Sequence, residues 1–309
     1  MPSRSSALRS ALRSMYADAS GHTTVHQDPR REGEENQIAC EVRRDPLTGR
    51  SGRVAHVLGF ELRPVDFTQM IADSRATCPF CPARIFEVTP RFPPDVVPQG
   101  RVQRGEAVVF PNLAPYDEHS AVVAMSQVHF VPMTDFAPAL LRDAFAAGLD
   151  YFRLVRRLPR TAYAQIFWNY LPASGGTQIH PHLQFFASVT PGNAMEDELA
   201  ASRRYAATEG QPYWLDLVAE EERLVERFIA RGAHTVWLTA FVSDSLLADT
   251  LVIFPEHRTL LDLADDPAQA AQAALDEFCR GLAQTLGHLA AQGVWRKVST
   301  ASASRGIQV

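Results

Sequence analysis

The sequence predicts an α+β protein in which helices flank antiparallel sheets, and three observations lead to this fold class. Short β-branched apolar runs, typical of strands, occur between longer segments whose apolar residues recur at helical spacing. Residues 121–136 (AVVAMSQVHFVPMTDF) resemble residues 250–263 (TLVIFPEHRTLLDL), with His129 and His257 at matching places. The 309 residues suffice for two domains or one large duplicated domain. We therefore expect two related strand–strand–helix halves.

The elements follow in order from local patterns. Residues 1–36 are polar and lack apolar periodicity, so we expect a disordered leader, although its arginine-spotted start would also suit an organellar transit peptide. The turn signal DPLTG predicts a hairpin within 38–64. Strands are expected over 105–112, 120–127, 163–171, 182–189, 234–242 and 248–255. Helices are expected over 136–158, 194–210, 213–232 and 266–293. The two expected halves are residues 37–200 and 201–309.

Composition and charge disfavour several classes of protein. With 30 Lys+Arg against 35 Asp+Glu, the net charge is −5, whereas a nucleic-acid-binding protein usually carries a basic stripe. No apolar run approaches the roughly 20 residues that cross a bilayer. We therefore expect a cytoplasmic protein with neither nucleic acid nor membrane as partner. Lys297 is the only lysine and lies in a tail-like stretch, which disfavours a P-loop and lysine-based covalent catalysis.

A cysteine pair, Cys78-Pro79-Phe80-Cys81, has the spacing of two thiolates on one tetrahedral zinc ion. Four cysteines in the whole chain are too few for a disulfide scaffold. The sequence has no second Cys-x-x-Cys pair, so the remaining ligands must be distant, and His129 and His180 are the natural candidates. A redox dithiol is the alternative. It would need a helix start directly after the pair, which Pro82 and the strand-like segment that follows disfavour.

The segment His180-Pro181-His182-Leu183-Gln184 follows a Ser-Gly-Gly-Thr loop at 174–177. Because side chains alternate along a strand, His180, His182 and Gln184 should point to one face. A single histidine on an apolar strand is usually a satisfied core residue. Two imidazoles and an amide on one face are not a core pattern, so the sequence predicts a functional site here.

These motifs resemble those of the galactose-1-phosphate uridylyltransferase family, the nucleotidyltransferase branch of the histidine-triad superfamily. The resemblance is carried by CPFC, HPHLQ, the hairpin RRDPLTGR (43–50) and FPNLAPYDEHSAVVAMSQVH (110–129). It extends from about Glu41 to Arg204 and continues weakly over 237–263. It implies duplicated histidine-triad-like halves and a homodimer.

The resemblance also implies a transferase of carbohydrate metabolism, specifically of galactose, that acts on a nucleoside diphosphate sugar and a sugar 1-phosphate. His182 matches the nucleophile that forms a nucleotidyl-histidine, and Gln184 matches the residue that binds a non-bridging phosphate oxygen. The positions that match phosphate and nucleoside contacts are Arg43, Asn112, Asn169, Ser174, Gly175, Gly176 and Thr177. The positions that match the ligands of one structural zinc are Cys78, Cys81, His129 and His180.

Two departures from the family leave the acceptor open. No later His-x-His segment exists, so we do not expect a second metal site at Glu198. The second half looks shortened and lacks the family's sugar-phosphate segment. One alternative is therefore a phosphorylase or hydrolase of nucleotide sugars or dinucleotides that uses the same histidine. Another is a non-catalytic, zinc-containing nucleotide-binding paralogue. His119 either lines the site or belongs to a polar turn.

Overall fold

The computed structural model describes most of the chain. The described residues are 20–27, 35–55, 66–159, 161–244, 249–257, 259–265 and 269–291. Lys297 and residues 1–19 of the expected leader lie outside them. The chain divides into two compact units. The first comprises residues 1–61, 192–230 and 236–253, and the second comprises residues 62–191, 231–235 and 254–309. These bounds differ from the expected boundary after residue 200, and the expected duplication stays a prediction.

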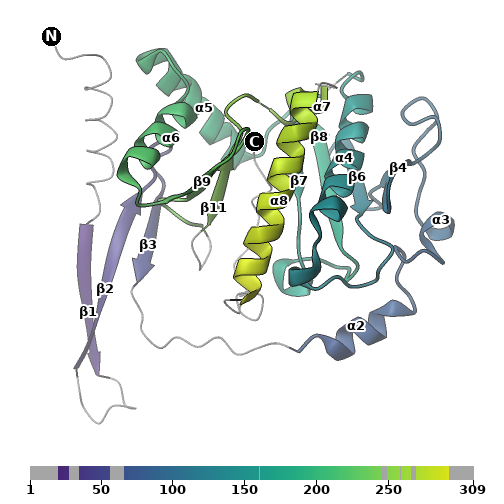
Figure 1. The fold of residues 1–309 in the computed structure, drawn as a ribbon, viewed down its shortest axis with the longest axis horizontal. Coiled ribbons are helices and arrows are strands. Elements are labelled where there is room, and N and C mark those ends of the chain that lie inside the picture. Colours follow the sequence, from purple (N-terminus) through teal and green to yellow (C-terminus); the bar gives the residue numbers. More distant parts are fainter. Residues whose placement is uncertain are drawn as a thin grey trace. The chain divides into compact units, whose positions relative to one another are not determined.

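The second unit contains a five-stranded antiparallel sheet in the order β4-β5-β6-β8-β7 (Figure 1). Its strands are β4 (Val102–Arg104), β5 (Ala107–Pro111), β6 (His119–Ala124), β7 (Tyr163–Phe167) and β8 (His182–Ser188). Its helices are α2 (Thr68–Arg75), α3 (Ile85–Val88), α4 (Pro138–Val155), α7 (Leu260–Asp265) and α8 (Gln269–Ala291). This mixture of helices and antiparallel strands confirms the expected α+β class.

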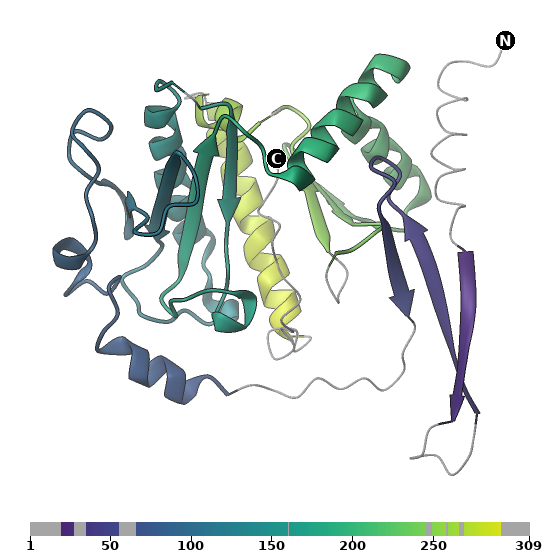
Figure 2. The same cartoon turned by 180° about the vertical axis from the view of Figure 1, so that it is seen from behind.

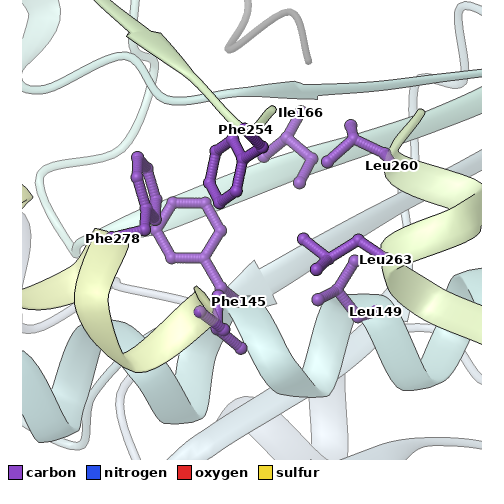
Figure 3. A pocket seen from close by; sticks show the side chains of 8 residues that line it. Phe145, Leu149, Ile166, Phe254, Leu260, Leu263 and Phe278 are labelled. Carbon is purple, nitrogen blue, oxygen red and sulfur yellow. The ribbon is translucent and has the colours of Figure 1, made fainter. Parts of the chain in front are cut away.

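Helices cover one face of this sheet. α4 and α8 lie side by side, as both views show (Figures 1 and 2). Phe185 of β8 packs against Phe152 of α4 with ring centroids 5.0 Å apart, and a Cβ added to Gly148 would overlap the Phe185 ring. Apolar side chains of α4, α7 and α8 surround a small cavity in this layer (Figure 3). The cavity is lined by Phe145, Leu149, Ile166, Phe254, Leu260, Leu263, Leu275 and Phe278.

The segment after the cysteine pair folds on itself. Arg84 and Ile85 donate their backbone N–H groups to the carbonyl of Cys81 at 2.9 and 3.0 Å, and α3 follows. The strand expected there is therefore wrong, because local hydrogen bonds satisfy the backbone groups that a neighbouring strand would otherwise pair. Ile85 and the partly buried Phe80 pack on Phe110 and its neighbours in β5 and β6. This segment thus covers part of the sheet face opposite α4.

In its described part, the first unit holds two three-stranded sheets and two helices. Its strands are β1 (Ser20–Gln27), β2 (Glu35–Arg44), β3 (Ser51–Ala55), β9 (Phe228–Arg231), β10 (Val236–Thr239) and β11 (Thr250–Ile253), and its helices are α5 (Asn193–Glu209) and α6 (Tyr213–Leu224). β1 pairs with β2 over its whole length. The disorder expected over 1–36 is therefore wrong for residues 20–27, because their backbone groups find partners in β2 rather than in water.

The expected hairpin is confirmed as β2 and β3. The Oδ1 atom of Asp45 accepts hydrogen bonds from the backbone N–H groups of Leu47 at 3.1 Å and Thr48 at 2.7 Å. Gly49 has a φ of 74°, a left-handed conformation that favours glycine. The turn chemistry of DPLTG therefore sets the register between the two strands.

The helix expected over 213–232 ends early, at Leu224. Val225 has a φ of 58° and its N–H donates to the carbonyl of Glu221 at 2.9 Å, so the chain leaves the helix and forms β9. The sequence predicts one long helix because the apolar residues of β9 happen to fall at positions that continue the helical spacing of α6. No described helix is long and apolar enough to cross a membrane.

Candidate active site and metal centre

The strand β8 presents the predicted site residues on the face opposite α4. Register pairs His182 with Ala124, Gln184 with Val122, and Phe186 with Ser120 on β6. Because directly opposed residues of antiparallel strands share a face, these side chains form one column along the sheet. The strand begins at His182, so His180 lies in the turn before it rather than on the strand as expected.

His182 is held in one tautomer. Its side chain is buried, with 4% exposure, and its Nδ1–H donates to the carbonyl of His180 at 2.8 Å. This bond leaves the Nε2 lone pair for chemistry. Burial lowers the pKa of His182, although the bond to the His180 carbonyl opposes that shift. The ring is therefore a neutral imidazole near pH 7.

Gln184 lies two residues further along the same column and is half-buried. Its side-chain amide makes no hydrogen bond within the described part of the chain. An amide can donate two hydrogen bonds and accept two. Next to a nucleophile, such an amide can bind an oxygen that gains negative charge during a reaction.

Four side chains converge into a candidate metal centre. One ligand atom each from Cys78, Cys81, His129 and His180 lies within 4.8 Å of all the others. The Nδ1 atom of His129 is 3.3 Å from the sulfur of Cys81. The Nδ1 atom of His180 is 3.6 Å from the sulfur of Cys78 and 3.7 Å from that of Cys81. Ordinary Zn–S and Zn–N bonds at tetrahedral angles separate sulfur and nitrogen by about 3.6 Å. The four residues therefore fit a zinc ion.

Hydrogen bonds from the Nε2–H groups of His129 and His180 orient the Nδ1 atoms of both imidazoles toward the cysteine sulfurs. The Nε2–H of His180 donates to the carbonyl of Ser126 at 2.7 Å. The Nε2–H of His129 donates to the hydroxyl of Ser74 at 3.0 Å, and that hydroxyl donates to the carbonyl of Ile71. Each Nδ1 atom is then free to bind a metal. Ser74 and Ser126 were missed by sequence reasoning, because a lone serine on a helix or after a strand carries no signal.

Electrostatics agrees with this assignment. Burial lowers the pKa of His129 and, to about 4, that of His180, so both rings are neutral, as metal ligands must be. Burial also raises the pKa of the Cys81 thiol to about 11. A bound dication would reverse that shift and hold the thiolate form. A metal site is favoured over a redox dithiol because two imidazoles converge with the two thiols. The local structure after the cysteine pair does not decide between them.

The loop between β7 and β8 contains the predicted phosphate-binding positions, residues 169–177. Leu171 has a φ of 68° and Gly175 a φ of 93°, so the loop holds one strained non-glycine residue. A Cβ added to Gly176 would lie 3.0 Å from the carbonyl oxygen of Asn169, which explains why glycine occupies this position. The hydroxyl of Ser174 donates to the carbonyl of Tyr170 at 2.7 Å. Thr177 is exposed and Asn169 half-exposed.

The remaining candidates are placed differently. Asn112 directly follows β5, and its backbone N–H donates to the carbonyl of Ser120 at 3.1 Å. His119 begins β6 and pairs with Ala187, so it lies on the sheet face opposite His182 and does not line the site. Arg43 and Glu198 lie in the first unit. There the Arg43 guanidinium contacts the Glu41 carboxylate at 2.9 Å.

Comparisons with known proteins found two relatives by sequence. An uncharacterized protein of Archaeoglobus fulgidus is 31% identical over 248 residues, which cover 80% of this chain and 72% of that protein. A galactose-1-phosphate uridylyltransferase of Streptomyces lividans is 28% identical over 244 residues, which cover 74% of this chain and 60% of that enzyme. The match thus spans less than two thirds of the Streptomyces enzyme. No family model matches the chain.

Solved structures share the fold. A galT-like protein of Arabidopsis thaliana aligns with a TM-score of 0.60 and 19% identity over 82% of this chain and 77% of its own. An ADP-glucose phosphorylase of the same plant, solved with ADP-glucose, aligns with a TM-score of 0.59 and 19% identity, over 82% of this chain and 79% of its own. A uridylyltransferase aligns with a TM-score of 0.54 and 20% identity, over 80% and 75% of the two chains.

Proposed function

Since this chain belongs to the galactose-1-phosphate uridylyltransferase family, we propose that it is a nucleotidyltransferase in which His182 carries the nucleotide covalently. The observation that carries the proposal is the 2.8 Å hydrogen bond from the His182 Nδ1–H to the His180 carbonyl. It leaves Nε2 as a neutral nucleophile on the same face of β8 as Gln184. The substrates are a nucleoside diphosphate sugar and a sugar 1-phosphate.

The reaction proceeds in two displacement steps. In the first, the Nε2 lone pair forms a bond to the α-phosphorus, and the bond from that phosphorus to the bridging oxygen breaks. The electron pair leaves with the sugar 1-phosphate. In the second, a phosphate oxygen of the acceptor attacks the same phosphorus, and the N–P bond returns its electron pair to Nε2. The proton stays on Nδ1 throughout, and its hydrogen bond to the His180 carbonyl stabilises the positive charge of the substituted ring.

Other predicted residues take the remaining roles. Gln184 donates to a non-bridging oxygen of the α-phosphate as charge builds there. The loop residues bind the phosphates and the nucleoside through backbone and side-chain groups, and Asn112 adds a further contact. The role of Arg43 near the phosphates stays a prediction. The loop residues with this role are Asn169, Ser174, Gly175, Gly176 and Thr177. The chain forms a homodimer.

Zinc is the proposed metal, and its role is structural. Cys78, Cys81, His129 and His180 would hold one ion, which supplies a cross-link between three segments of the second unit and no chemistry of its own. The proposal is supported by the donor set of two thiols and two correctly turned imidazoles. His180 also accepts the bond from His182, so the metal would fix the carbonyl that orients the nucleophile.

A phosphorylase is the second candidate function, and it differs only in the acceptor. It is supported by the fold shared with an ADP-glucose phosphorylase over 82% of this chain. In this case inorganic phosphate attacks the nucleotidyl-histidine and releases a nucleoside diphosphate. Product analysis with galactose 1-phosphate or inorganic phosphate as the acceptor separates the two reactions.

Trapping of the intermediate tests the proposal. The protein is incubated with UDP-glucose or ADP-glucose labelled at the α-phosphate and separated under denaturing conditions. Wild type should retain acid-labile label, and His182→Asn should retain none. His234→Asn, a histidine paired with Glu256, is the matched control and should label like wild type. Equal labelling of wild type and His182→Asn contradicts the mechanism. A non-catalytic paralogue would bind nucleotide without any label.

A further inference from the structure

A buried hydroxyl on the catalytic face has no partner. Ser120 lies on β6 with 8% exposure. Its Oγ atom is shielded from solvent and makes no hydrogen bond within the described residues. A buried hydroxyl without a partner destabilises a protein, so such groups in native structures call for an explanation. One such explanation is a ligand that supplies the missing hydrogen bond.

The hydroxyl belongs to the column that starts at the nucleophile. Ser120 stands opposite Phe186, which shares its face of β8 with His182 and Gln184. Ser120 is therefore four residues along the sheet from the level of His182, or about 13 Å at the usual rise of a strand. This distance is comparable with the span of a nucleoside monophosphate from its phosphorus to the far edge of its base. Gln184, which we assign to the phosphate, lies between the two levels.

Aromatic and apolar side chains surround this end of the column. The ring of Phe186 lies 5.4 Å from that of Phe167 and 6.1 Å from that of Tyr116. Tyr116 and Leu113 are 80% and 81% exposed, and both belong to the loop between β5 and β6. The rings of Phe186, Phe167 and Tyr116 lie at the same end of the column as the unsatisfied hydroxyl, and apolar side chains with a few polar groups are the lining that small-molecule sites use. Flat rings suit a nucleobase, which has an aromatic face of its own.

We propose that the Ser120 hydroxyl hydrogen-bonds the nucleobase of the nucleotide whose phosphorus His182 attacks. The inference rests on the proposed function and deepens it by assigning the base end of the site. A serine hydroxyl can donate to a carbonyl or ring nitrogen of the base and can also accept from an exocyclic amine. Phe186 and Tyr116 contribute the apolar surroundings.

The substitution Ser120→Ala should change nucleotide affinity without lowering the melting temperature, whereas replacement of a structural serine would do the opposite. Because the hydroxyl is unsatisfied in the free protein, its removal should leave the melting temperature of the free protein unchanged or higher. Affinity for the better-bound of UMP and AMP should fall about 3- to 10-fold, the worth of one hydrogen bond. Affinity for ribose 5-phosphate, which lacks the base, should stay within about twofold of wild type.

Thr161→Ala is the matched control. Thr161 is half-buried on the α4 side of the sheet, and its hydroxyl donates to the carbonyl of Val155 at 3.0 Å. Its replacement should lower the melting temperature and leave nucleotide affinity unchanged. Binding is measured by calorimetry and stability by thermal unfolding for both variants and wild type.

Three results overturn the inference. They are unchanged UMP and AMP affinity in Ser120→Ala, an equal loss of affinity for ribose 5-phosphate, and no nucleotide binding by wild type. The labelling experiment on His182 is read separately. If wild type is labelled but Ser120→Ala binds nucleotide normally, only the base assignment fails. If Ser120→Ala binds the nucleotide more weakly but wild type takes no label, the base assignment stands and the covalent mechanism fails.

Discussion

The carbonyl oxygen of His180 accepts the Nδ1–H of His182 at 2.8 Å, while the ring of the same His180 faces the thiols of Cys78 and Cys81. One residue therefore belongs to the candidate metal centre and also orients His182, the proposed nucleophile. Phe80, between the two cysteines, reinforces the link, because its ring lies 6.0 Å from that of His180 and 5.5 Å from that of His182. Loss of a ligand or of the metal should therefore disturb the orientation of His182 and lower activity.

Replacement of a metal-binding thiol should cost stability as well as activity. Cys78→Ser exchanges a thiolate for a weak ligand, and we expect a loss of more than about 4 kcal/mol in the free energy of unfolding, because a structural metal contributes folding energy directly. Chemical denaturation measures the loss. Cys40→Ser, a half-buried cysteine outside the metal centre, is the control and should behave like wild type. Equal stability of the two variants would contradict the assignment.

Zinc removal should act in the same direction without any mutation. We expect elemental analysis to find one zinc per chain, since the four donors fill a tetrahedral shell. Dialysis against a chelator should lower the melting temperature and the His182 labelling together, and added zinc should restore both. A metal-free protein with an unchanged melting temperature would refute the prediction.

Sequence reasoning goes furthest where chemistry is concentrated in a motif. His180, His182 and Gln184 are singled out because two imidazoles and an amide at period two have no apolar explanation. The structure brings a ligand atom of His180 within 4.8 Å of those of His129 and the cysteine pair, and the functional roles of these residues stay predictions. Sequence reasoning fails where tertiary contacts decide. β1 forms by pairing with β2, and no local sequence pattern predicts this pairing. α6 ends because Val225 adopts a left-handed conformation, which valine rarely does and which its sequence position does not indicate.

Low pH should weaken the attachment of α8 through Glu277. Its carboxylate accepts N–H bonds from Ala233 at 2.8 Å, His234 at 3.1 Å and Thr235 at 2.7 Å. Burial raises the pKa of Glu277, but the Thr235 hydroxyl and these N–H groups outweigh it and lower the pKa below its usual value. A lowered folded-state pKa contributes stability above the unfolded pKa of about 4.3 and loses it as pH falls through the folded value.

Glu277→Gln should therefore destabilise the protein by about 1–3 kcal/mol at pH 7, since an amide replaces an ionised acceptor. The difference from wild type should shrink as the pH falls below about 4.3, where the wild-type carboxylate also becomes protonated. Denaturation at several pH values measures both effects. Glu256→Gln, at an exposed carboxylate that contacts His234, should have little effect. A difference that is independent of pH would show that charge is not the cause.

The close approach of α4 to the five-stranded sheet should make Gly148 intolerant of any side chain. A methyl group added at this position would overlap the ring of Phe185, the neighbour of Gln184 on β8, so Gly148→Ala must shift either the helix or the strand. We expect a loss of about 1–3 kcal/mol in the free energy of unfolding, the usual cost of overpacking. Gly287→Ala, in α8, meets nothing within 4 Å and should instead stabilise the helix by up to about 1 kcal/mol. Opposite signs for the same substitution in two helices, measured by thermal or chemical unfolding, would confirm that α4 packs this tightly. Two stabilising results would contradict it.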